Sequence, residues 1–145
     1  MDYEKNFEQW LQSDELSQDE KARLRALNEE EKKEMFFCPL QFGTAGMRGV
    51  LDLGTNRMNV FTVRRATKGL AEYIKTLGEE AMQRGVVISY DTRRFSSEFS
   101  IEVAKVLAQN NINAYLFDTV HPDVLVCNTP SQRDCRRYDN RLAQS

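Results

Sequence analysis

The run Val86-Val87-Ile88-Ser89-Tyr90 decides the fold class that this sequence predicts. The run is short, apolar and rich in β-branched side chains, which is typical of a strand buried in a parallel sheet. A helix is predicted from Ser96 or Ser97 to about Asn110, and a second strand is predicted at 113–117. A strand, a helix and a strand joined by short connections form a right-handed crossover unit. The sequence therefore predicts an α/β domain with a parallel strand pair.

The segment Asp91-Thr92-Arg93-Arg94 directly follows the first of these strands. Ligands of open α/β sheets bind at the C-terminal ends of the strands. Asp91, Arg93 and Arg94 are therefore candidate ligand-binding residues, although arginines in such places often only orient their neighbours.

A helix is also predicted ahead of the first strand, with Thr62 as its N-cap and an end near Thr76. Its apolar stripe is predicted to be buried, and it consists of Val63, Ala66, Leu70, Tyr73, Ile74 and Leu77. Basic residues at 64, 65 and 68 either face an anion or form a solvated face, and the second interpretation is the more common one.

A glycine-rich segment lies further towards the N-terminus: Phe42-Gly43-Thr44-Ala45-Gly46-Met47-Arg48-Gly49. Glycine permits positive φ and lets an anion approach the backbone N–H groups, and an arginine fork matches a phosphate. The segment is neither a dinucleotide fingerprint nor a Walker loop. Spacing alone leaves two interpretations open, a phosphate-binding loop and a glycine-rich turn with one surface arginine. Residues 50–53 are expected to form a short strand, and Arg57 is either a second anion contact or an exposed loop arginine.

Residues 2–35 are predicted to be helical. Ser17 and Glu20 have the form of a capping box, and Pro39 ends the helical region. The charge run at 29–34 indicates a solvated helix face, with an acidic docking helix as the alternative.

Length and composition indicate one globular domain: 145 residues, of which 41% are hydrophobic and 29% charged. The net charge of -2 argues against a nucleic-acid-binding protein. No apolar run has the length of a membrane span and the N-terminus does not have the form of a signal peptide, so a cytoplasmic location is expected. Three cysteines without a C-x-x-C pair, together with a single histidine, His121, predict reduced thiols and no metal site.

In combination, these motifs resemble the first domain of the α-D-phosphohexomutases, over roughly residues 35–122. The resemblance is greatest to bacterial phosphoglucomutases, followed by phosphomannomutases. It implies a three-layer α/β/α domain at 40–122 with a mainly parallel mixed sheet, preceded by a helical extension at 1–39 and incomplete at its C-terminus. It also implies an isomerase that interconverts hexose 1-phosphate and hexose 6-phosphate through a phosphoserine and a bisphosphate intermediate.

The resemblance assigns roles to particular residues. Arg48 would contact a phosphoryl group and Thr44 would help to shape the catalytic loop, while Gly43 and Gly46 belong to the same phosphate-binding segment. Asp91, Arg93 and Arg94 match the strand-end motif, in which an arginine borders the catalytic serine loop and an aspartate holds the turn. The family uses Mg²⁺ bound by aspartates of a second domain, hexose 1,6-bisphosphate as intermediate or activator, and three further domains. A phosphorylated hexose is the expected partner, without nucleic acid or membrane.

The sequence departs from this family after His121-Pro122. The family motif Thr-Ala-Ser-His-Asn-Pro, whose serine carries the phosphoryl group, is not among these 145 residues. One permitted set of codons for Asp134–Ser145, read from its second base, encodes Ile-Ala-Gly-Val-Met-Ile-Thr-Ala-Ser-His-Asn. Residues 123–145 have no sustained periodicity and are expected to be a disordered tail. The codon match leads to the hypothesis that this tail is translated out of frame. Because the serine motif is missing, the chain alone is expected to be inactive. The alternative is a non-catalytic module that binds a sugar phosphate or a protein.

Overall fold

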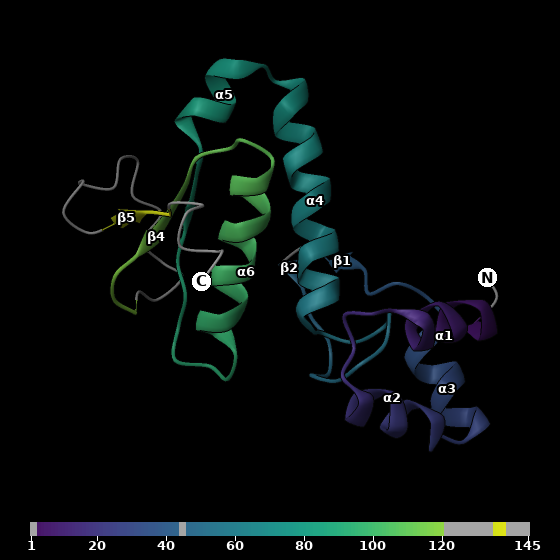
Figure 1. Ribbon diagram of the computed structural model, residues 1–145. Coiled ribbons are helices and arrows are strands. Elements are labelled where there is room, and N and C mark those ends of the chain that lie inside the picture. The colour runs from purple at the N-terminus through teal and green to yellow at the C-terminus, as the bar shows by residue number, and fades with distance from the viewer. Residues whose placement is uncertain (1–2, 44–45, 121–134, 139–145) are drawn as a thin grey trace. The chain divides into compact units, whose positions relative to one another are not determined.

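The computed structural model describes residues 3–43, 46–120 and 135–138. The chain divides into two compact units, Met1–Thr62 and Val63–Ser145, and each unit has a hydrophobic core of its own. Figure 1 follows the helices and strands along the chain.

Three short helices begin the first unit: α1 (Tyr3–Gln12), α2 (Gln18–Arg25) and α3 (Glu29–Phe36). Ser17 and Glu20 form a capping box at the start of α2, which confirms the prediction. Asn28 and Glu31 form a second capping box at the start of α3. Because each box pairs N–H groups that the first helical turn leaves free, it determines where the helix begins.

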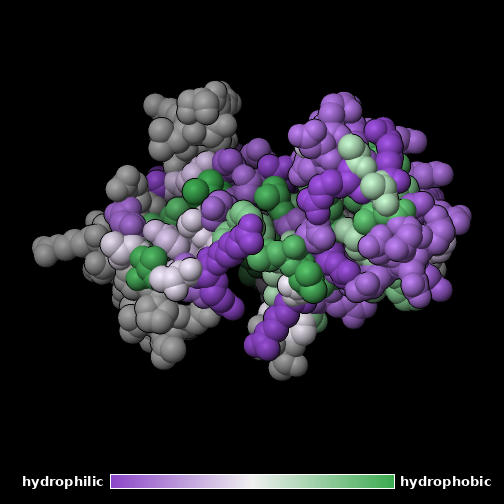
Figure 2. Space-filling view, turned by 90° about the horizontal axis from the view of Figure 1, so that it is seen from below, coloured by the Kyte–Doolittle hydropathy of each residue, from purple (hydrophilic) through white to green (hydrophobic). Residues whose placement is uncertain are grey.

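Aromatic side chains dominate the core of the first unit. Phe36 is fully buried, and the rings of Phe7 and Trp10 meet it edge-on at centroid distances of 5.3 and 5.7 Å. Trp10 also contacts the ring of Phe61 at 5.0 Å. The buried aliphatic members are Leu16, Leu24, Met35 and Leu53. These core side chains lie inside the unit, whereas Phe37, Phe42, Val50 and Leu51 are exposed. Figure 2 shows a mostly hydrophilic surface over its helices.

The glycine-rich segment forms a small hairpin of two strands, β1 (Phe42–Gly43) and β2 (Gly46–Met47), which pair antiparallel. The strand expected at 50–53 does not form, and only an isolated bridge between Leu51 and Met58 is present. The reason is local, because the Asp52 carboxylate accepts the N–H of Leu53 at 2.8 Å and so competes with a strand ladder.

The helix α4 (Val60–Thr76) begins before Thr62, and its predicted end at Thr76 is confirmed. The N–H of Thr62 donates to Asn59 Oδ1 at 3.0 Å, and the N–H of Asn59 donates to Thr62 Oγ1 at 3.0 Å. The expectation that Thr62 is the N-cap is therefore wrong: Asn59 precedes the helix and its side chain accepts the N–H of Thr62, which lies in the first turn.

The buried stripe of α4 differs from the predicted one. Val63 and Ile74 are buried as expected, but Leu70, Tyr73 and Leu77 are exposed. Thr67 and Ala71 take the buried positions between Val63 and Ile74. Ala71 and Ile74 join a core that includes Ala104 and Leu107, and the small side chains of Ala71 and Ala104 permit helices to approach closely.

The predicted strand–helix–strand unit is confirmed in the second unit. After α5 (Glu79–Arg84) come β3 (Val86–Ile88), α6 (Ser96–Gln109) and β4 (Ala114–Phe117). The two strands pair in parallel, with Val86 opposite Ala114 and Ile88 opposite Leu116. Helix α6 packs on both strands (Figure 1). The core that results consists of Ala71, Ile74, Ile88, Ala104, Leu107, Ile112 and Ala114.

A third strand, β5 (Cys135–Arg137), pairs antiparallel with β4 and makes the sheet mixed, in the order β3-β4-β5. These three residues belong to the segment that was expected to lack regular structure. An edge strand offers a row of free N–H and C=O groups, which any extended backbone can complete irrespective of its side chains. Tyr138, which follows β5, donates its N–H to Ala114 O at 2.8 Å, and the rest of the expected tail lies outside the described residues.

Candidate functional site

The first candidate segment is the β1–β2 hairpin. Its register places Phe42 opposite Met47 and Gly43 opposite Gly46. Gly46 has φ of +92°, a conformation that glycine adopts without a steric penalty, and a Cβ there would meet no atom within 4 Å. Thr44, predicted to shape this loop, lies outside the described residues. The hairpin thus keeps open space beside its backbone.

Arg48 follows the hairpin and is exposed. Within the described part of the chain its guanidinium makes no hydrogen bond or ion pair. The backbone that follows is held in place, because Met58 N–H donates to Val50 O at 2.8 Å and Gly49 packs closely on the side chain of Leu40. A planar cationic fork with all its donors available can bind an oxyanion in a bidentate manner.

The second candidate segment follows β3. The Asp91 carboxylate accepts the backbone N–H of Arg93 at 3.0 Å through Oδ1, and it accepts Arg93 Nε through Oδ2. The N–H of Asp91 donates to Ser96 Oγ at 3.1 Å. The Arg93 backbone N–H lowers the pKa of Asp91, and the Arg93 and Ser96 side chains add to this effect against partial desolvation. The Asp91 carboxylate thus holds both the Arg93 side chain and the backbone of the turn.

Arg94 has a different setting from Arg93. Its guanidinium carbon lies 5.0 Å from the centroid of the Phe95 ring, and it makes no hydrogen bond or ion pair with a described residue. Phe95 precedes α6 with φ of +64°. No sequence pattern indicated this conformation, because phenylalanine rarely adopts it.

Three of the other predicted basic residues, Arg57, Arg64 and Lys68, are paired within their own units. Arg64 Nε contacts Glu102 at 2.7 Å, and Lys68 Nζ contacts Glu72 and Asn110 at 2.9 and 2.6 Å. Arg57 Nη2 contacts Glu34 at 2.8 Å, with only 12% of the arginine side chain exposed. These contacts favour the structural interpretation of all three residues over anion binding.

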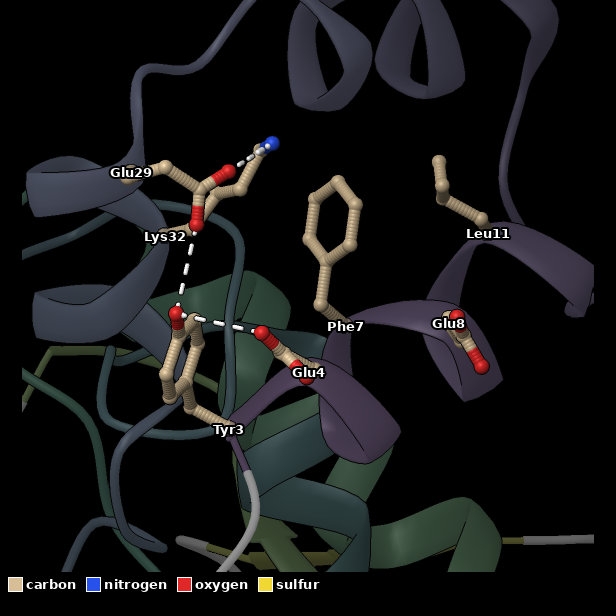
Figure 3. Close-up of a pocket in the computed structure, with 7 residues that line it drawn as sticks. All are labelled: Tyr3, Glu4, Phe7, Glu8, Leu11, Glu29 and Lys32. Carbon is tan, nitrogen blue, oxygen red and sulfur yellow. Dashed lines mark hydrogen bonds and ion pairs between the residues drawn. The ribbon is translucent and has the colours of Figure 1, made fainter.

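A pocket of about 310 Å³ lies among residues of α1 and α3, away from both arginine segments in the sequence. Figure 3 shows Lys32 and Tyr3 reaching the same carboxylate, Glu29, at 2.7 and 3.2 Å. The hydrogen bond from Lys32 is the main cause of a lowered pKa at Glu29, and Lys32 also lies over the Phe7 ring at 5.2 Å. Because the charges of Lys32 and Glu29 already form an ion pair with each other, the pocket offers no unpaired charge from these two residues to a ligand.

The described residues contain no group of three or more His, Cys, Asp or Glu side chains that could hold a metal ion. The aspartates that the resemblance implies as Mg²⁺ ligands belong to a second domain, and the described residues offer no substitute for them. No helix in the described ranges is both long and apolar enough to cross a membrane.

Comparison with known proteins decides the family. The model of the phosphoglucomutase/phosphomannomutase α/β/α domain I matches residues 39–135, about two thirds of the chain. The chain belongs to this family. The match includes both the Arg48 and the Asp91 segments, and it runs past Pro122, the predicted end of the domain. The α/β fold preceded by N-terminal helices agrees with it.

Curated phosphoglucomutases are similar to this chain over about 90 residues. The phosphoglucomutase of Staphylococcus saprophyticus is 47% identical over 90 residues, which are 62% of this chain and 16% of that protein. The phosphoglucomutase of Staphylococcus aureus strain USA300 is 44% identical over 89 residues, which are 61% of this chain and 16% of that protein. The matched part of this chain thus spans about a sixth of the length of these relatives. No solved structure gives a significant match.

Proposed function

We propose that this chain contributes phosphate-contacting segments of domain I to a phosphohexomutase, an isomerase that interconverts hexose 1-phosphate and hexose 6-phosphate. The observation that carries the proposal is the family match over 39–135, which contains both arginine segments. These segments lie in different compact units, and each is proposed as a phosphate contact in its own right.

Arg48 is proposed to contact the phosphoryl group. Its guanidinium is exposed and has no ion-pair partner among the described residues, so phosphate would not compete with any of their carboxylates for it. Gly43 and Gly46 would let the phosphate approach the loop backbone, and Thr44 would donate its hydroxyl as the resemblance implies. At the strand end, Asp91 would hold the turn while Arg93 and Arg94 border the ligand.

The 145-residue chain is proposed to bind a hexose phosphate without turning it over. Phosphoryl transfer by this family needs a phosphorylated serine, and the motif that carries it is not among these residues. Mg²⁺ supplies charge neutralisation to such reactions when bound, and the described residues offer no site for it. Without nucleophile and metal, positioning alone leaves most of the barrier in place.

Binding can be tested by titrating the ¹⁵N-labelled chain with glucose 1-phosphate. We expect saturable shifts in the backbone amides of 42–49 and 91–96, and weaker binding by Arg48→Ala. Arg23→Ala is the matched control, because it removes an equal charge from an arginine of the first unit that pairs with Asp52. Shifts that follow ionic strength alone, or equal effects of the two variants, would contradict the proposal.

Turnover can be tested in parallel by a coupled assay of glucose 6-phosphate formation. We expect none from the chain, and conversion at the rate of a complete phosphoglucomutase would refute the proposed inactivity. The nucleotide sequence behind 123–145 tests the reading-frame hypothesis. If its second frame encodes the serine motif, expression in that frame with the downstream sequence should produce mutase activity. Binding without any route to activity would favour the alternative of a non-catalytic module.

A further inference from the structure

The corner between Arg94 and α6 has a backbone conformation that is unusual for its residue. Phe95 has φ of +64° and ψ of +7°, in the left-handed region. Asn111 is the other non-glycine residue with positive φ in the described ranges, and asparagine tolerates this conformation. A bulky aromatic residue does not, and such strain persists where the surroundings impose it, often at functional sites.

This conformation accompanies a stack of three side chains. The Phe95 ring lies 6.1 Å from the Phe99 ring with an interplanar angle of 33°. The Arg94 guanidinium lies 5.0 Å from the centroid of the same Phe95 ring. Phe95 is 39% exposed, whereas Phe99 on α6 is partly buried. The exposed ring therefore connects a helix residue to the guanidinium of Arg94.

An aromatic ring holds an arginine without occupying its N–H groups, because the attraction acts on the face of the guanidinium plane. The neighbouring Arg93 is held in a different way, since its Nε and its backbone N–H are both donated to Asp91. Arg94 thus combines a held position with donors that remain available to a ligand.

We propose that Phe95 is a positioning residue, whose ring holds the Arg94 guanidinium for contact with the phosphoryl group of the ligand. This inference rests on the function proposed above and adds a residue that the family motif did not indicate. The opposing explanation is structural: Phe95 would only pack against Phe99 to fasten the start of α6.

Phe95→Gly separates the two explanations, because it removes the ring and also relieves the left-handed backbone. We expect a midpoint of thermal unfolding equal to or above that of the unchanged chain, together with a phosphate affinity about fivefold lower, the size expected for a lost cation–π contact. Phe95→Tyr keeps the ring and should retain the affinity. Inorganic phosphate and glucose 1-phosphate are the probes, read by ¹⁵N NMR of the 145-residue chain at constant ionic strength.

A double-mutant cycle completes the test. As a single substitution, Arg94→Ala should weaken phosphate binding. In the Phe95→Gly background it should cause little further loss of affinity, since the two residues act as one unit. If Phe95→Gly binds phosphate as the unchanged chain does, or if the two losses simply add, the positioning role is overturned. If Arg48→Ala and Arg94→Ala both leave binding unchanged, the proposed function itself fails, and this outcome is distinct from a failure of Phe95 alone.

Discussion

The two arginine-bearing segments, 42–49 and 91–96, hold their arginines in opposite ways. Arg48 follows a hairpin whose two strands have two residues each, and it is exposed. It makes no hydrogen bond or ion pair with a residue that the structure describes. Arg93 is fixed by two hydrogen bonds to Asp91, whose own N–H donates to Ser96 at the start of α6. Both segments match the same family model.

This difference separates residues that only a ligand would engage from residues that also maintain the fold. An exposed side chain without contacts contributes little to the free energy of unfolding, so its replacement is felt mainly in binding. A residue inside a hydrogen-bonded turn affects stability and binding together. Stability measurements alone would therefore overlook Arg48 and overstate the functional weight of Asp91.

The largest expected effect on stability concerns the strand β3, which leads into the segment 91–96. We call this segment the held segment, because Asp91 fixes Arg93 in it, and we call 42–49 the open segment. Gly85 has φ of +77°, and a Cβ there would lie 2.2 Å from the carbonyl oxygen of Asn113. Gly85→Ala should lower the free energy of unfolding by about 3 kcal/mol or more, because β3 and its connection to β4 must shift. Denaturant unfolding and amide exchange over 86–117 measure this. Unchanged protection of these amides would mean that the strand does not depend on this close approach.

The next effect concerns the open segment in a longer enzyme. Replacing by alanine the arginine that corresponds to Arg48 in a complete phosphoglucomutase should lower kcat about 100-fold, the usual result of removing one charged transition-state donor. Stability should change by no more than about 0.5 kcal/mol. Steady-state kinetics and thermal unfolding of the same preparation provide both numbers. A large loss of stability would show that this arginine maintains the fold, as Arg93 does, and would contradict the difference between the two segments.

Acid should affect the held segment selectively. The pKa of Asp91 is lowered from its ordinary value of 3.8, chiefly by the Arg93 backbone N–H. A carboxylate with a depressed folded-state pKa stabilises the fold above its unfolded-state pKa, and this contribution disappears as the pH falls through the folded-state value. The NMR titration of the Asp91 carboxyl should therefore have its midpoint below 3.8. Asp91→Asn should remove the matching part of the acid dependence of unfolding, and an ordinary midpoint would disprove the Asp91–Arg93 contact.

The smallest effect tests the hairpin backbone. Gly46→Ala should lower the free energy of unfolding by about 1 kcal/mol, since φ of +92° is strained for alanine although the space is open. Gly69→Ala is the matched control in the exposed interior of α4, and there alanine should raise stability by about 0.5–1 kcal/mol. If both substitutions raise the free energy of unfolding, the positive φ of Gly46 is not required by the fold.

Local patterns predicted a large part of this protein. The apolar run at 86–88, the helix at 96–109 and the strand at 114–117 were readable because burial and periodicity act over a few neighbouring residues. The capping box of Ser17 and Glu20 is equally local. The family resemblance at 42–49 and 91–94 depended on specific residue combinations, and the family match agrees with it.

Two of the corrections concern contacts between distant residues, whereas those at Thr62 and at 50–53 have local causes. The sequence of α4 does not reveal that Thr67 and Ala71 are buried while Leu70 and Tyr73 are exposed. The buried face depends on the core that Ala71 and Ile74 share with residues beyond position 86. The pairing of β5 with β4 likewise uses backbone groups that any sequence possesses.

The amino-acid sequence by itself determined the family, the parallel strand–helix–strand unit and which arginines to consider, because these depend on short-range residue patterns. Only the tertiary structure distinguished the arginines from one another. Arg57, Arg64 and Arg93 have carboxylate partners, Arg94 lies on an aromatic ring, and Arg48 is exposed. The physical reason is that charge pairing depends on which side chains folding brings within a few ångströms, and neither residue type nor spacing specifies that.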